Sequence, residues 1–302
     1  MYFAVDSRDP AVWVDGLLQT IDAAPDAHWF ALVDGVFDYG RKPFAAPLQS
    51  FPLYGATSWL HELLPASPYL LPLDRRAGVD LGSILNALGK HCQGRPMLSF
   101  VASWQPAEHL VRLWQPCLQP MVVEDGSRYL LRFADTRVLP ALPGAMNPTG
   151  WSQITAPLLH WCYVDRAGEL ETLWLSESHA EPATYPIEQL VLPQADIDRM
   201  IDAAMPDAIL DLIDRESPGS LPDTGRADGY RLVSQACALA KKYSIDSTPD
   251  TVELAAHALE TNGADLREPG LLALLGDAHR EPGALQSYLR ATKDTAIEMG
   301  SA

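Results

Sequence analysis

The chain has 302 residues, and its 47% hydrophobic and 20% charged content is typical of a soluble globular protein of one large or two modest domains. The net charge of −17 makes nucleic acid and anionic membranes poor electrostatic partners. No stretch approaches the ~18 apolar residues of a membrane span, and the N-terminus lacks the basic start and apolar core of a signal peptide. We therefore expect a cytoplasmic protein that binds neither nucleic acid nor membranes.

The first part of the chain alternates helix-like and strand-like patterns. Helices are predicted where apolar residues recur at three- and four-residue spacing, and strands where a short apolar run stops at a turn. In chain order we expect a helix over 9–24, a strand over 29–33, a short helix from Thr57 ended by Pro65, a strand over 68–74, a helix over 80–92, a strand over 96–103 and a helix over 105–117. This order predicts an α/β (α+β) domain with a mixed sheet flanked by helices.

The stretch VVEDGSRYLLRFADTRVLPAL, Val122–Leu142, predicts a β-hairpin because Asp-Gly stands between two apolar runs. In its second arm Arg132 shares a strand face with leucine, so it needs a carboxylate or several carbonyls as partners. Asp135 suits the N-cap of a short helix over 136–144, and Arg137 can pair with an acid across the junction. We interpret these charges as a structural lock, because no nucleophile or general acid is evident beside them.

The last third of the sequence reads as helical. A second hairpin is expected first, and no strand candidate appears after about Val191. The hairpin arms are expected over 158–165 and 170–175, and the helices over 195–216, 230–243, 248–263 and 282–294. We therefore predict an α/β domain over residues 1–190 and an all-helical lobe over 191–302, with a hinge near 217–229. The acidic charge of this lobe suits either a solvated surface or a basic partner.

Motifs for nucleotide, metal and nucleophile chemistry are missing from the sequence. It contains no G-x-G-x-x-G, Walker-type, C-x-x-C or G-x-S-x-G pattern. The widely spaced cysteines are best explained as reduced, buried thiols: Cys92, Cys117, Cys162 and Cys237. We therefore predict no cofactor, no metal and no catalytic residue.

Two arrangements leave alternatives open. Asp34 follows a buried strand, where a carboxylate often lies in a ligand crevice. It equally makes a plain turn, in which Asp34 accepts backbone N–H groups and Gly35 takes a positive φ, and we favour the turn. His160 and Cys162 would share a strand face and could form a thiol–imidazole pair. Ordinary packing is the favoured interpretation, because no third orienting group is evident.

The order of the motifs resembles the effector adaptor, or chaperone, family of the bacterial type VI secretion system (Tap/Tec-like domain of unknown function). The resemblance rests on WFALVDGVFD, LYGATSWLHELLPASPYLLPL and the run from MLSFVASW to RVLPALPG. It covers about residues 25–145 well and extends less clearly to about 215. The family-motif positions, to which we assign no catalytic role, are Asp34, Gly35, Tyr54, Arg132, Phe133, Asp135 and Arg137.

The resemblance implies a non-enzymatic task. Such adaptors bind a toxic effector in the producing cell and help to load it onto VgrG, the valine-glycine repeat spike protein. On this hypothesis the α/β domain is the shared scaffold, the helical lobe recognises the effector, and the chain is monomeric when alone. Two alternatives stay open: an enzyme that uses His109 or His160 with nearby acids, and an immunity protein that binds a toxin and silences it.

Overall fold

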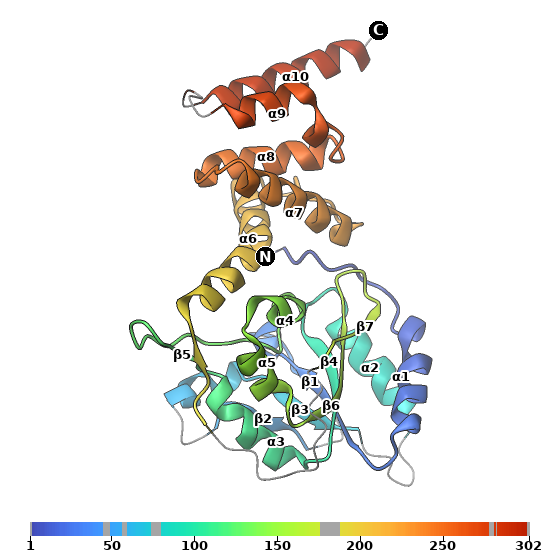
Figure 1. Cartoon of the computed structure of the whole chain (residues 1–302). Coiled ribbons are helices and arrows are strands. Elements are labelled where there is room, and N and C mark those ends of the chain that lie inside the picture. Colours follow the sequence, from blue (N-terminus) through green and yellow to red (C-terminus); the bar gives the residue numbers. More distant parts are fainter. Residues whose placement is uncertain are drawn as a thin grey trace. The chain divides into compact units, whose positions relative to one another are not determined.

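The computed structural model describes residues 2–44, 49–55, 59–73, 80–175, 188–277, 281 and 283–300. Contacts divide the chain into an α/β unit, Val5–Ala203, and a helical unit, Met1–Ala4 with Ala204–Ala302. The expected fold class, an α/β part followed by a helical part, is confirmed (Figure 1). The division by contacts falls inside helix α6, whereas the boundary expected from the sequence stands at residue 190.

The elements of the α/β unit follow the predicted alternation closely. They are α1 (Ala11–Ala23), β1 (His28–Val33), η1 (Gly35–Asp38), β2 (Phe51–Pro52), η2 (Trp59–Ala66), β3 (Tyr69–Pro72), α2 (Leu81–Cys92), β4 (Leu98–Ser103), α3 (Ala107–Trp114), η3 (Gln115–Cys117), β5 (Met121–Val122), η4 (Leu139–Ala141), α4 (Leu142–Ala145), α5 (Pro148–Thr155), β6 (Leu158–Val164), β7 (Leu170–Thr172), β8 (Val191–Leu192) and α6 (Gln194–Glu216). Residues 56–58 and 74, at the ends of two predicted elements, lie outside the described residues.

Six strands form one antiparallel sheet in the order β2-β3-β1-β4-β6-β7. The two longest apolar runs, β1 and β4, are its central strands, and they are buried almost throughout. A strand with neighbours on both sides and helices on both faces needs apolar residues at every position, so these runs do not alternate. The sheet thereby places Asp34, directly after β1, at one end of a central, buried strand.

Helices cover both faces of this sheet (Figure 1). On one face Trp13 of α1 lies against Phe100 of β4, with ring centroids 5.5 Å apart. On the other face the ring of Trp161 stacks on Trp114 of α3 and Trp151 of α5, at 5.9 and 6.1 Å. Phe133 meets the ring of Trp161 edge-on at 6.0 Å and is only 1% exposed. This aromatic cluster is the centre of the larger core, because it joins α3, α5, the sheet and the segment before η4.

The hairpin expected over Val122–Leu142 does not form. The Asp125-Gly126 turn exists, with φ +71° at Gly126 and a hydrogen bond from Val122 N–H to the Ser127 carbonyl (2.8 Å). The second arm forms no strand, and it meets the first through an isolated bridge between Met121 and Arg128 and a hydrogen bond from Leu131 N–H to the Leu118 carbonyl (2.9 Å). On its other edge, strand β5 pairs in parallel with β8. The local turn signal was right, but the arm after the turn does not continue as a paired strand.

The second hairpin is confirmed. Strands β6 and β7 pair antiparallel, and Asp165 N–H donates to the Glu169 carbonyl (2.9 Å) across the turn. Gly168 has φ +76°, which a residue with a side chain adopts only with strain. The register runs from Cys162↔Thr172 to Val164↔Leu170. Strand β7 is the last strand in the sheet order.

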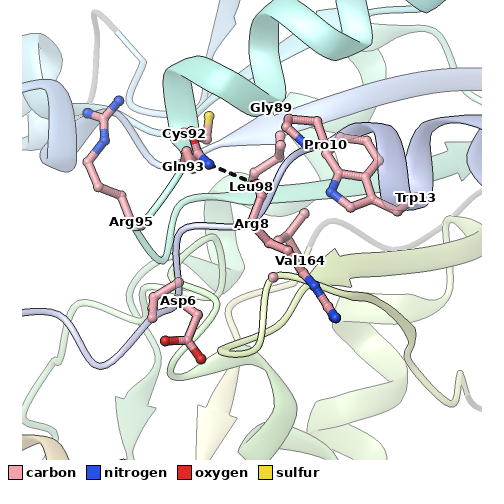
Figure 2. A pocket seen from close by; sticks show the side chains of 13 residues that line it. Asp6, Arg8, Pro10, Trp13, Gly89, Cys92, Gln93, Arg95, Leu98 and Val164 are labelled. Atoms are coloured by element: carbon pink, nitrogen blue, oxygen red, sulfur yellow. Dashed lines mark hydrogen bonds between the residues drawn. The ribbon is translucent and has the colours of Figure 1, made fainter. Parts of the chain in front are cut away.

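The segment before α1 lies along α2 and the β6–β7 turn (Figure 2). Gln93 donates from its side-chain amide to the Arg8 carbonyl (3.0 Å), and Asp6 N–H donates to the Arg166 carbonyl (2.7 Å). Gly89 is required where Pro10 approaches, because a Cβ there would lie 2.5 Å from the proline ring. The hollow left between these residues is about 20 Å³, which holds one water at most.

The helical unit has its own core. Its elements are the later part of α6 with α7 (Arg226–Lys242), α8 (Thr248–Glu260), η5 (Asp265–Arg267), α9 (Pro269–Gly276) and α10 (Ala284–Gly300). Buried alanines such as Ala236, Ala255 and Ala258 let these helices approach closely. The expected hinge over 217–229 is shorter than predicted, because α7 begins at Arg226. Helix α9 was not predicted from the sequence.

The N-terminal residues belong to this helical unit. Ala4 is 1% exposed within its core, and the Tyr2 hydroxyl donates to the Pro222 carbonyl (3.2 Å). The Arg226 guanidinium lies over the Tyr2 ring, 5.1 Å from its centroid. These contacts join the start of the chain to the segment that precedes α7.

Truncation of Phe133 tests the aromatic cluster. We expect Phe133→Ala to lower the free energy of unfolding by about 3–5 kcal/mol, because it removes a fully buried ring and leaves a cavity. Leu130→Ala, in the same segment but 36% exposed, is the matched control and should cost less than about 1 kcal/mol. Denaturant titration of both variants measures the difference. Equal losses in the two variants would contradict the packing described.

Candidate functional site

Asp34 begins the 3₁₀ turn η1 at the end of β1. Its Oδ1 accepts the Val36 N–H (3.2 Å), and its own N–H donates to the Met97 carbonyl (2.9 Å). The turn favoured from the sequence is therefore present. Gly35 is needed for a different reason than expected: its φ is not positive, but a Cβ would lie 2.2 Å from the Ser67 carbonyl oxygen. The backbone of η1 thus packs directly on the segment before β3.

Arg132 joins two buried carboxylates. Its Nη2 lies 2.7 Å from Asp34 Oδ2 and 3.3 Å from Asp135 Oδ2. Both aspartates are 1% exposed, while the Arg132 side chain is 29% exposed. The expectation that a half-buried arginine at this position needs carboxylate partners is confirmed.

Arg137 completes the same cluster from the other side of Asp135. Its Nε and Nη2 donate to the two carboxylate oxygens of Asp135 at 3.1 and 2.8 Å, a bidentate pair. Asp135 Oδ1 also accepts the Arg137 backbone N–H (3.0 Å), so it caps the turn that leads into η4 at Leu139. The guanidinium carbons of Arg132 and Arg137 each lie 5.4 Å from the centre of the Phe37 ring. We call Asp34, Arg132, Asp135, Arg137 and Phe37 the arginine brace.

Burial controls the ionisation of this brace. Removal from water raises the pKa of Asp34 to about 6, although the adjacent Arg132 charge lowers it in part. Tyr54, 4% exposed, has its pKa raised to about 12 by burial and by the Asp34 charge. Tyr54 N–H donates to the Ser67 hydroxyl (2.9 Å), which places this residue beside Gly35 and Asp34.

A second buried charge cluster holds the other end of η1, and the sequence reasoning missed it. The Asp38 carboxylate receives Arg95 Nη1 at 2.7 Å and lies 3.0 Å from His91 Nε2. Arg95 Nη1 also donates to the Phe37 carbonyl (3.0 Å), and its other terminal nitrogen donates to the His91 carbonyl. The one available signal was the basic end of α2, where cations suit the helix dipole.

The structure brings six of the seven family-motif positions together around η1. They are Asp34, Gly35, Tyr54, Arg132, Asp135 and Arg137, whereas Phe133 points into the aromatic core. A hollow of about 410 Å³ lies beside η1 and is lined mainly by Pro43, Phe44, Leu64, Pro65 and Leu71, with Asp38 and Tyr69 as polar members. Neither His109 nor His160 lines it.

Burial shifts the pKa values of two cysteines and of His160 in the direction that favours their neutral forms. Burial raises the pKa of Cys117 and of Cys162 to about 12, so both thiols stay protonated near neutral pH. Burial also lowers the pKa of His160, whose ring lies 5.5 Å from that of Trp29. No hydrogen bond joins His160 to Cys162 in the described residues. These positions therefore look like core packing, the interpretation favoured from the sequence.

No group of three or more His, Cys, Asp or Glu side chains in the described residues is arranged to hold a metal ion. Within the same residues, no helix has both the length and the apolar character needed to cross a membrane. The carboxylates of the brace are instead occupied by arginines.

Comparison with known proteins gives one finding. Residues 29–153 match the model of a family described as a domain of unknown function (DUF4123). The matched region begins in β1 and ends in α5, so it contains every residue of the arginine brace. No curated protein and no solved structure matches the chain.

Loss of the arginine tests the brace directly. Arg132→Gln leaves the Asp34 carboxylate buried without its nearest counter-charge, so we expect a loss of about 3–5 kcal/mol in the free energy of unfolding near neutral pH. The double variant Asp34→Asn/Arg132→Gln should recover part of that loss. Arg128→Gln, at an exposed position of the same segment, is the matched control. A double variant no more stable than Arg132→Gln alone would contradict the pairing.

The raised pKa of Asp34 predicts a pH dependence of known sign. The folded chain binds a proton at Asp34 up to pH about 6, whereas the unfolded chain releases it near 3.8. As pH rises between these values the folded state loses stability at this group, on the order of 3 kcal/mol in all. Asp34→Asn lacks this titration, so the stability of wild type relative to the variant should fall over that window and level off above it. Urea unfolding of both proteins at several pH values measures the difference, and a flat difference would count against the buried carboxylate.

Proposed function

We propose that this chain is an effector adaptor of a bacterial type VI secretion system, which binds a cognate toxic effector and helps to load it onto the VgrG spike. One observation carries the proposal. The region that matches the DUF4123 family, residues 29–153, coincides with residues 25–145, whose ordered motifs resemble such adaptors. Six of the seven motif residues gather around η1, which supports treating them as one structural unit of the scaffold.

The chemistry of the brace supports a scaffold role. Its arginines and aspartates saturate one another, and the cysteine thiols near neutral pH are protonated. Such a cluster fixes backbone position and leaves no activated nucleophile within hydrogen-bond reach in the described residues. A protein that works by holding another polypeptide needs this kind of rigid surface more than it needs reactive groups.

The surface supports partner binding. Large apolar side chains are exposed at several places on the α/β unit, among them Tyr39 (72%), Trp174 (66%), Val123 (63%) and Trp104 (49%). Exposed aromatic residues are the usual anchors of protein interfaces. The net charge of −17 favours a partner with basic surface and speeds its association.

Binding and secretion assays test the adaptor function. Co-expressed with the effector encoded beside it, the chain should co-elute with that effector in size-exclusion chromatography. Deletion of its gene should abolish delivery of this effector while leaving delivery of an unrelated effector, the control, intact. Absence of association with both the effector and the spike would contradict the proposal. Restored growth of cells that express the toxin inside would instead identify an immunity protein.

A further inference from the structure

Strand β7 is an open edge of the six-stranded sheet. Among the residues that the structure describes, it lies last in the sheet order and pairs with β6 alone. Leu173 N–H donates to the Trp161 carbonyl (2.8 Å) and Asp165 N–H to the Glu169 carbonyl (2.9 Å), which fixes which pairs exchange hydrogen bonds. Because these pairs alternate along an antiparallel ladder, the N–H and C=O groups of Leu170 and Thr172 face away from β6. No described residue is bonded to them.

The opposite edge is protected in a way that β7 is not. Strand β2 has two residues, and one of them is Pro52, which has no N–H to offer. Proteins commonly block free edges with short strands, proline or charge, because an unpaired edge is a template for another strand. Strand β7 is also short, with three residues, and it carries the charge of Glu171, but it has no proline, so each of its residues keeps an N–H.

An exposed tryptophan stands directly after this edge. Two residues beyond the Cys162↔Thr172 pair, the same register places Trp174 opposite His160, which pairs with Ala102. Ala102 pairs in turn with Trp29, whose ring contacts that of His160. Trp174 therefore extends an aromatic row across the sheet, but it is 66% exposed while Trp29 is 3% exposed. An added strand would place its own side chain next in this row.

The negative charge of Glu171 at this edge favours a basic strand as the partner. Glu171 is exposed on the other face of β7, and opposite charges facing each other across strands are favourable while like charges are not. The chain as a whole is acidic, so a second copy of it would bring like charge to this edge. An added strand is therefore favoured on both faces of the sheet if it places a basic residue opposite Glu171 and an aromatic or β-branched residue beside Trp174.

We infer that the free edge of β7 binds an extended, basic segment of a partner polypeptide, which adds to the sheet as a seventh strand. Backbone hydrogen bonds to Leu170 and Thr172 hold the segment, and contacts with Glu171 and Trp174 determine which side chains it carries. The inference names the chemistry of the partner and does not require the adaptor function. Under the proposed function, the segment belongs to the effector.

A labelled peptide tests the edge in isolation from any effector. The probe is a synthetic ten-residue peptide in which Lys alternates with Val and Tyr, titrated with the full chain by fluorescence anisotropy. We expect saturable binding that Thr172→Pro weakens at least about tenfold, because proline removes the outward N–H without breaking a bond to β6. Trp174→Ala should weaken it by a similar factor, through loss of the aromatic anchor. Neither change alters the net charge, so non-specific attraction between the acidic chain and the peptide is held constant.

Matched controls separate the edge from the rest of the surface. Thr172→Val keeps the N–H and the β-branched shape. Tyr39→Ala removes an aromatic ring that is as well exposed as Trp174 (72% against 66%) but lies after η1, away from β7 in the sequence. Both variants should bind the peptide as wild type does. Absence of saturable binding, or binding to Thr172→Pro as tight as to wild type, overturns the inference. A wild-type dimer in light scattering that Thr172→Pro converts to monomer also overturns it, because the occupant is then a second copy.

The effector complex distinguishes this inference from the adaptor function. In hydrogen exchange, the amides of Leu170 and Thr172 should become protected when the effector binds. A stable effector complex with no such protection, and with full affinity in Thr172→Pro, upholds the adaptor function and overturns the edge as its site. Peptide binding at the edge without any effector complex upholds the edge and counts against the adaptor function.

Discussion

The burial of two carboxylates beside one another is the constraint on which the α/β unit depends. Asp34 and Asp135 both lie out of water, and like charges in that position repel unless a cation lies within reach of both. Arg132 meets the need by contacting each of them. Since Asp34 ends the central strand and Asp135 starts the turn into η4, this one contact sets the distance between the sheet and the segment that leads to α4 and α5.

Buried ion pairs therefore hold both ends of one short turn, η1. The brace holds the start of η1 through Asp34, and Arg95 with His91 holds its end through Asp38. Phe37, between the two aspartates, receives both brace arginines on its ring. Buried charged groups that pair with one another in this way hold the backbone of η1 at both of its ends.

Local sequence patterns predicted the helices and strands. Contacts between residues that are far apart in the chain could not be predicted from such patterns. The apolar runs of β1 and β4 identified the central strands, and the cost of a buried charge foretold that Arg132 needs carboxylates. That Asp34 is one of them, 98 residues away, has no local signature. The same limit applies to β5, because a turn motif says nothing about the distant strand Val191–Leu192 that pairs with the other edge of β5. Asp38, His91 and Arg95 were missed because each is unremarkable in its own stretch of sequence.

The placement of Tyr2 and Ala4 has a consequence for how the chain is made and handled. Tyr2 is bonded to Pro222 across a separation of 220 residues, and Ala4 is buried in a core made by residues such as Ile209, Val233 and Leu254. During synthesis, Tyr2 and Ala4 must therefore wait until more than about 200 further residues have been made before their packing partners exist. A fragment that ends before α7 would leave Ala4 without the larger part of this core, which includes Val233 and Leu254.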